Sequence, residues 1–366
     1  MKRGTIFIFL FILIAGGIIG ASRFLGSQPP LEFTIAVDPL AQSWVQQAVN
    51  AFNDTQPVVN TRRIQFNVTP IDDLAVWGGQ GGWTPTAHPD AWIAASTTSL
   101  NFARSNSLPL VVVADSLART PLLWGAYVSR LNVLTTNGAQ PLDWESVAAG
   151  AKAEAWVNLG GSQDWQFIKL GFAQPTAKMG GLGALLTGAA AYFQTADLTA
   201  VTLSPQPFRN WMQPVLASVP SYSTLGADPA AAMARGPSTV EIALLPESQW
   251  LPNLNGINNR EAVQVSYPAY QFMLDFPMSS WQDNQPTNAD RQAAVALLRD
   301  WLLTPAQQAA APAFGLRAAA VEPTDADALF ANAVQYGIQL NPVYGELVDP
   351  PTLNEVRAFL QWVAAN

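Results

Sequence analysis

Short apolar runs alternate along the chain with stretches in which apolar residues recur every three or four positions. The runs predict strands at 33–37, 63–71, 90–96 and 108–114. The recurring pattern predicts helices at 39–53 and 97–105, and Asp38 with Pro39 supplies an N-cap and a first helical residue. Because strands alternate with helices, this half of the chain predicts βαβ units around a largely parallel sheet.

The same alternation returns after residue 120. Strands are predicted at 167–172 and 272–276, and the stretch 240–250 is predicted as a strand followed by a loop. Helices are predicted at 144–149, 181–193, 207–217, 290–303 and 305–314. A chain of 366 residues exceeds the usual size of one hydrophobic core. The predicted fold class is therefore α/β with two domains.

The N-terminus has the pattern of an export signal. Lys2 and Arg3 precede an apolar run from Ile6 to Ala21, and Gly20-Ala21-Ser22 offers small residues for cleavage. The run is close to the length that spans a bilayer, so residues 1–22 are predicted as a signal peptide or as an uncleaved anchor formed by residues 5–21. Residues 23–31 are predicted as a linker. The remainder is expected outside the cytoplasmic membrane, at the cell surface or in the periplasm.

Composition excludes several kinds of protein. The net charge is −8 and no basic run follows Lys2-Arg3, so no nucleic-acid partner is expected. The chain has no Cys and one His, His88, which argues against thiolate chemistry, His-based catalysis and His-rich metal sites. His88 is predicted in an exposed turn, and Asp72-Asp73 as a solvated turn and not a catalytic carboxylate pair. We therefore predict no enzyme, cofactor or metal site; a hydrolase is the least favoured alternative.

A glycine-rich loop follows the predicted strand at 167–172. Its sequence, GFAQPTAKMGGLGALLT at 171–187, matches neither the Walker A spacing nor the dinucleotide fingerprint. It still joins a strand to a helix, and such a junction offers unpaired N–H groups to a ligand. We expect Thr176 to Gly180 to contact that ligand.

Three further strand ends also carry polar residues, and ligands of α/β proteins bind beyond such ends. The candidate ligand contacts are Asp38, Ser43, Ser96, Thr97, Thr120, Thr176, Lys178, Met179, Gly180, Glu247 and Tyr267. Asp38 and Ser96 have a second interpretation as helix N-caps, and Lys178 one as a solvated surface residue. Glu247 suits an anion only if it is protonated or paired.

Thirteen Trp residues bear on the ligand, because aromatic faces can stack on sugar rings. Most of them are expected in the core. Trp77 and Trp83 flank a glycine-rich loop and are the candidates for exposed platforms.

Several segments occur in an order that resembles bacterial extracellular solute-binding proteins. They are TIAVDPLAQSWVQQAVNAFNDTQP, DAWIAAST, ARTPLLWG, PTAKMGGLGAL, ALLPES, YPAY and AAVALLRDWLLTPAQQAAAPAFGLRAAA. The chain is most similar to the two-lobed type that includes molybdate and sulfate binders, over Phe33 to Val321. The most specific part is the last segment, which in the family packs on the first lobe.

The resemblance implies two α/β lobes, each a mostly parallel sheet flanked by helices, joined by a two-strand hinge. Residues 32–120 would form the first part of lobe 1, 121–265 lobe 2, and 266–366 the return to lobe 1 with the C-terminal helices. It also implies a small ligand, an oxyanion, a sugar or similar, that is captured between closing lobes and presented to an ABC transporter permease. A membrane-anchored sensory or adhesive protein remains the alternative, which an intact anchor would favour.

Overall fold

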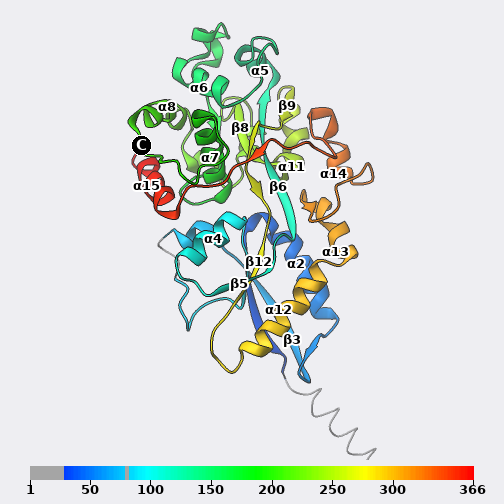
Figure 1. Cartoon of the computed structure of the whole chain (residues 1–366). Helices are drawn as coiled ribbons and strands as arrows, with labels where there is room; N and C mark the ends of the chain where they lie inside the picture. The colour runs from blue at the N-terminus through cyan, green and yellow to red at the C-terminus, as the bar shows by residue number, and fades with distance from the viewer. Residues whose placement is uncertain (1–28, 79–81) are drawn as a thin grey trace, which may run out of the picture.

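The computed structural model describes residues 29–78 and 82–366. The predicted signal or anchor at 1–22 lies outside these residues, as does most of the predicted linker. Within the described ranges, no helix is long and apolar enough to cross a membrane. Figure 1 shows two lobes, with the blue and cyan N-terminal part of the chain and the yellow α12 in the lower one and the green middle part in the upper one.

The first lobe is a six-stranded sheet in the order β2-β3-β1-β4-β12-β5. Its elements are β1 (Leu31–Val37), α2 (Pro39–Asp54), β2 (Val58–Val59), β3 (Arg62–Pro70), α3 (Asp73–Trp77), β4 (Ala91–Ile93), α4 (Thr97–Ser105) and β5 (Leu110–Ala114). Strand β1 is parallel to β3 and β4, with Ile35 opposite Val68 and Ala91. Helix α2 buries Trp44, Val45 and neighbours at helical spacing, which packs it on the sheet.

The second lobe contains α5 to α11 and a sheet built around β6 (Ala118–Tyr127). Its elements are α5 (Val128–Leu134), α6 (Trp144–Ala153), η1 (Trp156–Leu159), η2 (Gln163–Trp165), β7 (Leu170–Gly171), α7 (Met179–Phe193), α8 (Gln206–Ala217), α9 (Tyr222–Leu225), α10 (Pro229–Met233), β8 (Ile242–Pro246), α11 (Glu247–Asn258) and β9 (Val263–Ser266). Strands β8 and β9 run antiparallel to β6, and only β7 and β8 pair in parallel. The mostly parallel sheet expected for each lobe is thus absent from the second, because β6 enters from the hinge and runs against both of its neighbours.

Two strand segments connect the lobes. The chain leaves the first lobe through β6 and returns through β10 (Tyr270–Gln271), β11 (Met273–Leu274) and β12 (Met278–Trp281). Strand β11 pairs antiparallel with β6, and β12 then enters the first sheet between β4 and β5. The Leu117 N–H donates to the Phe276 carbonyl at 3.1 Å between these segments. They form the two-strand hinge.

After the hinge the chain packs on the first lobe. Helix α12 (Asn288–Leu302) lies beside α2, and the Trp301 Nε1 donates to the Ala48 carbonyl at 2.9 Å. Next come α13 (Pro305–Ala310) and η3 (Ala311–Phe314), where the Gln307 carbonyl accepts from the Trp44 Nε1 at 3.1 Å. Residues 288–314 therefore complete the face of the first sheet that α2 covers.

The last fifty residues follow a different course. They form β13 (Arg317–Ala318), which pairs with β6, then α14 (Ala328–Ala331), η4 (Val334–Tyr336), β14 (Glu346–Leu347) and α15 (Leu353–Ala364). Phe359 of α15 packs on Phe208 of α8, with ring centroids 5.8 Å apart. Arg357 donates through Nη2 to the Trp77 carbonyl at 2.6 Å. Helix α15 therefore touches both lobes, beside α8 and above α4 in Figure 1.

Several local predictions are wrong. Trp77 is fully buried and donates through Nε1 to Ser99, so it is no exposed platform, whereas Trp83 is partly buried against Trp92. His88 stacks on Trp281 with ring centroids 4.0 Å apart and is not an exposed turn residue. Tertiary packing covers these side chains, and local polarity gives no sign of it.

Two strand-end predictions also need correction. The strand expected at 167–172 is reduced to β7, because Phe167 lies at the surface. Residues 247–250 are helical and not a loop, since Pro246 ends β8 and the acidic Glu247 starts α11.

Candidate functional site

A small cavity lies where the two lobes meet. Its volume is about 80 Å³. The first lobe lines it with Asp38, Pro39, Leu40, Asp72 and Ala95, and the second with Ala173, Lys178, Met179, Gly180, Ala227, Pro246 and Gln249. The cavity thus joins the ends of β1 and β3 to the start of α7, so it brings together Asp38 and the residues Lys178, Met179 and Gly180 of the glycine-rich loop.

Asp38 is positioned by the junction of β1 and α2. Its Oδ1 accepts the Leu40 N–H at 2.9 Å, which confirms the N-cap interpretation, and its own N–H donates to the Ile93 carbonyl. Asp38 is only 5% exposed. Burial raises the pKa of its carboxyl to about 7; the Leu40 N–H lowers it, Asp72 raises it and Lys178 lowers it. This carboxyl therefore both caps a helix and lines the cavity.

Lys178 reaches across the cleft. Its Nζ lies 2.5 Å from the Asp72 Oδ1, so one ion pair bridges the second lobe and the first. Both side chains are about one-third exposed, so solvent screens the pair. The backbone N–H groups of Met179 and Gly180, at the start of α7, have no hydrogen-bond partner among the described residues. The second lobe thus presents these donors and the Gln249 Oε1, likewise unpartnered among the described residues, to the cavity, and the first presents two carboxylates.

Asp73 lies in the interior of the first lobe, near Asp38 and Asp72. It is fully buried, and its Oδ2 accepts the Ala95 N–H at 2.8 Å. Burial raises the pKa of Asp73 well above its ordinary value, and the nearby Asp38 raises it further. The prediction of a solvated Asp72-Asp73 turn is wrong for Asp73, because α3 begins there and turns its side chain inward.

Seven of the eleven predicted contacts lie outside the cavity lining. Ser43 is exposed within α2, and Ser96 caps α4 by accepting the Ser99 N–H. Thr97 donates its N–H and hydroxyl to Asp275, at 2.7 and 2.6 Å. Thr120 is buried and its Oγ1 accepts the Ser248 N–H at 2.9 Å.

Thr176 lies in a neighbouring groove of about 380 Å³ between the lobes. Its hydroxyl accepts from the Gln174 Nε2 at 3.1 Å. The groove is also lined by Asp72 and by Arg357 and Leu360 of α15. Since Asp72 lines both spaces, the groove lies next to the cavity on the side that α15 covers.

Glu247 and Tyr267 come together at the hinge, around Arg317. Arg317 is fully buried and contacts Glu247 twice, with Nε 2.6 Å from Oε2 and Nη2 2.8 Å from Oε1. Its Nη1 donates to Glu322 at 2.7 Å, and the Tyr267 hydroxyl donates to Glu247 at 2.8 Å. Burial raises the pKa of Glu247, and Arg317 lowers it. We call Glu247, Tyr267, Arg317 and Glu322 the hinge cluster.

Sequence reasoning missed Asp72, Gln249 and Arg317. Asp72 had a usable signal, since it lies between a strand and a helix as Asp38 does. Arg317 had none, because its partner Glu247 lies seventy residues away.

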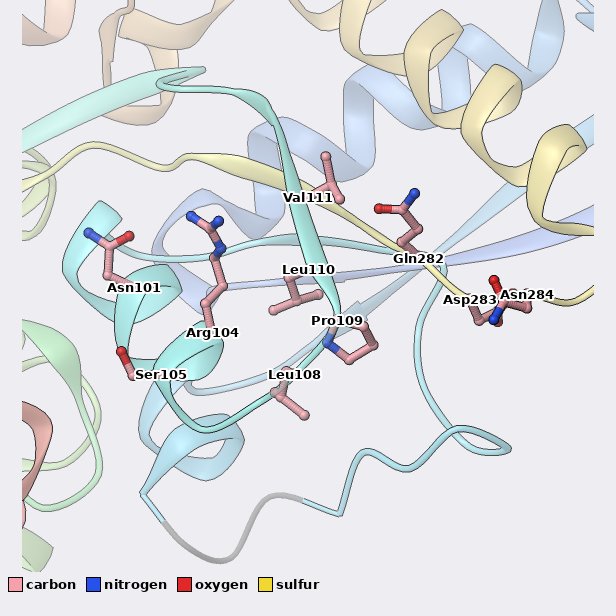
Figure 2. A pocket seen from close by; sticks show the side chains of 10 residues that line it. All are labelled: Asn101, Arg104, Ser105, Leu108, Pro109, Leu110, Val111, Gln282, Asp283 and Asn284. Carbon is pink, nitrogen blue, oxygen red and sulfur yellow. The ribbon is translucent and has the colours of Figure 1, made fainter.

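A larger hollow of about 810 Å³ lies on the first lobe beside β5 (Figure 2). It is lined by Asn101 and Arg104 of α4, by Leu110 and Val111, and by residues 282–284. All of these belong to one lobe, so movement of the lobes cannot enclose a ligand there. The described residues contain no group of three or more His, Cys, Asp or Glu arranged to hold a metal ion.

Comparison with family models and with curated proteins gives no match. Solved structures do match. The ferric binding protein from Campylobacter jejuni has a TM-score of 0.55 at 12% identity, over 91% of this chain and 97% of that one. The cyclic alpha-maltosyl-1,6-maltose binding protein from Arthrobacter globiformis has a TM-score of 0.53 at 12% identity, over 92% and 93%.

AfuA, the periplasmic binding protein from Actinobacillus pleuropneumoniae with fructose-6-phosphate bound, has a TM-score of 0.52 at 11% identity, over 80% and 87%. The fold is that of the two-lobed periplasmic binding proteins. The predicted fold class is thereby confirmed at the level of two α/β lobes and a hinge. Identities this low show the fold alone.

Proposed function

We propose that this protein is an extracytoplasmic solute-binding protein that captures a small ligand between its lobes and presents it to an ABC-type transporter. The observation that carries the proposal is the interlobe cavity, in which donors of the second lobe face the carboxylates of the first. A two-strand hinge joins the two lobes. Ligands of open α/β sheets bind at such strand ends. The solved structures with this fold bind ligands as different as ferric iron and sugars, which supports the class of function.

The proposed lobe boundaries follow the hinge: residues 32–120, 121–265 and 266–366, of which the last fifty pack largely on the second lobe. We place the ligand at Asp38, Lys178, Met179 and Gly180, with Thr176 at the edge of the adjacent groove. Glu247 and Tyr267 are proposed to act through the hinge, since Arg317 occupies both of them. No catalytic role is proposed for any of these groups.

The molybdate or sulfate type of ligand is not favoured by this site. Asp38 and Asp72 both line the cavity, and carboxylates repel an oxyanion. Export rests on Lys2-Arg3 and the apolar run behind them, and we propose that residues 5–21 either direct export or hold the protein at the membrane.

A thermal-shift screen of the chain from Gln28 onward tests the function. Oxyanions, sugars, amino acids and amines are compared, since a ligand at 100 times its Kd adds about 2.7 kcal/mol of stability. We expect one class to stabilise the parent and to lose this effect in Asp38→Asn. Stabilisation that persists unchanged in Asp38→Asn and in Lys178→Met would place the ligand elsewhere. If no class stabilises the parent, the proposed function fails.

A further inference from the structure

The first lobe brings more acceptors than donors to the cavity. Asp38 uses Oδ1 for the Leu40 N–H, and no donor among the described residues reaches its Oδ2. Because Asp38 is 95% buried and lines the cavity, Oδ2 is the oxygen left to face it. Asp72 lies beside it on the same lobe. A carboxylate that is largely removed from water and has a donor for only one of its oxygens favours a ligand group that donates hydrogen bonds and carries positive charge.

A protonated amine already occupies part of this space. Lys178 is the only cationic side chain that lines the described cavity, and its ammonium group comes from the opposite lobe to meet Asp72 at 2.5 Å. The side chain is one-third exposed and its ion pair is weak, so it can be displaced. Lys178 therefore shows which chemical group Asp72 accepts.

Resting on the proposed binding function, we propose that the ligand carries a protonated amine, which binds between Asp38 and Asp72 and displaces Lys178 from Asp72. Burial and the charge of Asp72 both raise the pKa of Asp38, whereas Lys178 lowers it. An added ammonium group would lower that pKa in the same way, so the site is short of positive charge without one. The freed Lys178 and the Met179 and Gly180 N–H groups would then face the remainder of the ligand.

Chemical rescue tests this inference. In Lys178→Ala the full chain loses the ammonium group but keeps both carboxylates, so n-propylammonium can take the vacated place. We expect it to raise the melting temperature of Lys178→Ala by about 2 °C or more. The same concentration should leave Lys178→Ala/Asp38→Asn and the surface variant Lys152→Ala unshifted, and potassium chloride at equal ionic strength serves as the salt control.

The outcomes separate the two proposals. Stabilisation of the wild type by glucose or sulfate but not by 1,4-diaminobutane would overturn the amine and leave the binding function standing. Equal shifts in Lys178→Ala and in its Asp38→Asn double variant would also overturn it. If Lys178→Ala does not fold, 1,4-diaminobutane is titrated into the wild type: a shift that Asp38→Asn abolishes supports the amine, and no shift overturns it. No response of the wild type to any class contradicts the binding function itself.

Discussion

The cavity and the hinge cluster both bury carboxylates, but they differ in how many of the carboxylate oxygens receive a hydrogen-bond donor. Glu247 meets a bidentate arginine and a tyrosine hydroxyl, so each of its oxygens has a donor. Asp38 has a donor for one oxygen only, and the fully buried Asp73 has no partner for its Oδ1. A satisfied network holds a structure together, whereas an unsatisfied one at an interlobe cavity is available for a ligand.

The largest effect is expected from breaking the satisfied network. Arg317→Leu leaves Glu247 buried and without its counter-ion, which should lower the free energy of unfolding by about 3–5 kcal/mol. Urea denaturation measures it. Arg299→Leu is the control, because its partner Asp300 is mostly exposed and the change should stay below about 1 kcal/mol. If adding Glu247→Leu to Arg317→Leu restores no stability, the pair is not what holds this region.

At the cavity we expect a substitution to raise the free energy of unfolding and not to lower it. The raised pKa of Asp38 means that the folded state keeps a proton that the unfolded state has released between about pH 4 and 7, so this group lowers stability as pH rises through that window. Asp38→Asn keeps a good N-cap and removes the titration. We expect it to be more stable than the parent at pH 8, by at most about 4 kcal/mol, and nearly equal at pH 4.

Urea denaturation at both pH values checks this, with Asp143→Asn, at the N-cap of α6, as the matched control. An Asp38→Asn variant that is destabilised equally at both pH values would mean that Asp38 is only a cap. The hinge and the cavity would then differ less than their hydrogen bonds suggest.

A smaller effect distinguishes the roles of the predicted contacts. Tyr267→Phe removes the hydroxyl that donates to Glu247 and accepts the Gln339 N–H. The loss should be about 1–2 kcal/mol of stability, with ligand affinity unchanged. Calorimetric titration with whichever compound the screen identifies measures the affinity, and a tenfold loss would return Tyr267 to the ligand site.

The smallest stability change is expected for Lys178→Met. Its ion pair with Asp72 is partly exposed, so unfolding should change by less than about 1 kcal/mol. The pair nevertheless joins the lobes, so small-angle scattering should show a larger radius of gyration without ligand. Lys152→Met, on the surface of α6, should leave that radius unchanged. An equally compact Lys178→Met would show that the closed arrangement needs no ion pair.

These clusters also show what local sequence can predict. Asp38-Pro39 after an apolar run sets a strand end and a helix start at once, so the cap and its place at the sheet edge were both predictable. The same holds for the loop at 176–180, where glycines allow the backbone of α7 to approach Pro246. Pairing between distant residues gives no such signal. From the sequence, Glu247 is predicted to contact the ligand and Trp77 to be exposed. In the structure Arg317 pairs with Glu247, and α4 covers Trp77.

The contact of α15 with both lobes has a consequence for the rate of binding. Arg357 is fixed to the second lobe through its helix and donates to carbonyl and amide oxygens of the first lobe, at Trp77 and Asn106. If these bonds must break, together with the Lys178–Asp72 ion pair, before the cleft opens, only the open fraction of molecules admits a ligand, and the apparent Kd rises by the inverse of that fraction. The observed association rate should then reach a plateau at high ligand concentration, and the rate at which the cleft opens, which includes breaking the Arg357 hydrogen bonds, sets this plateau.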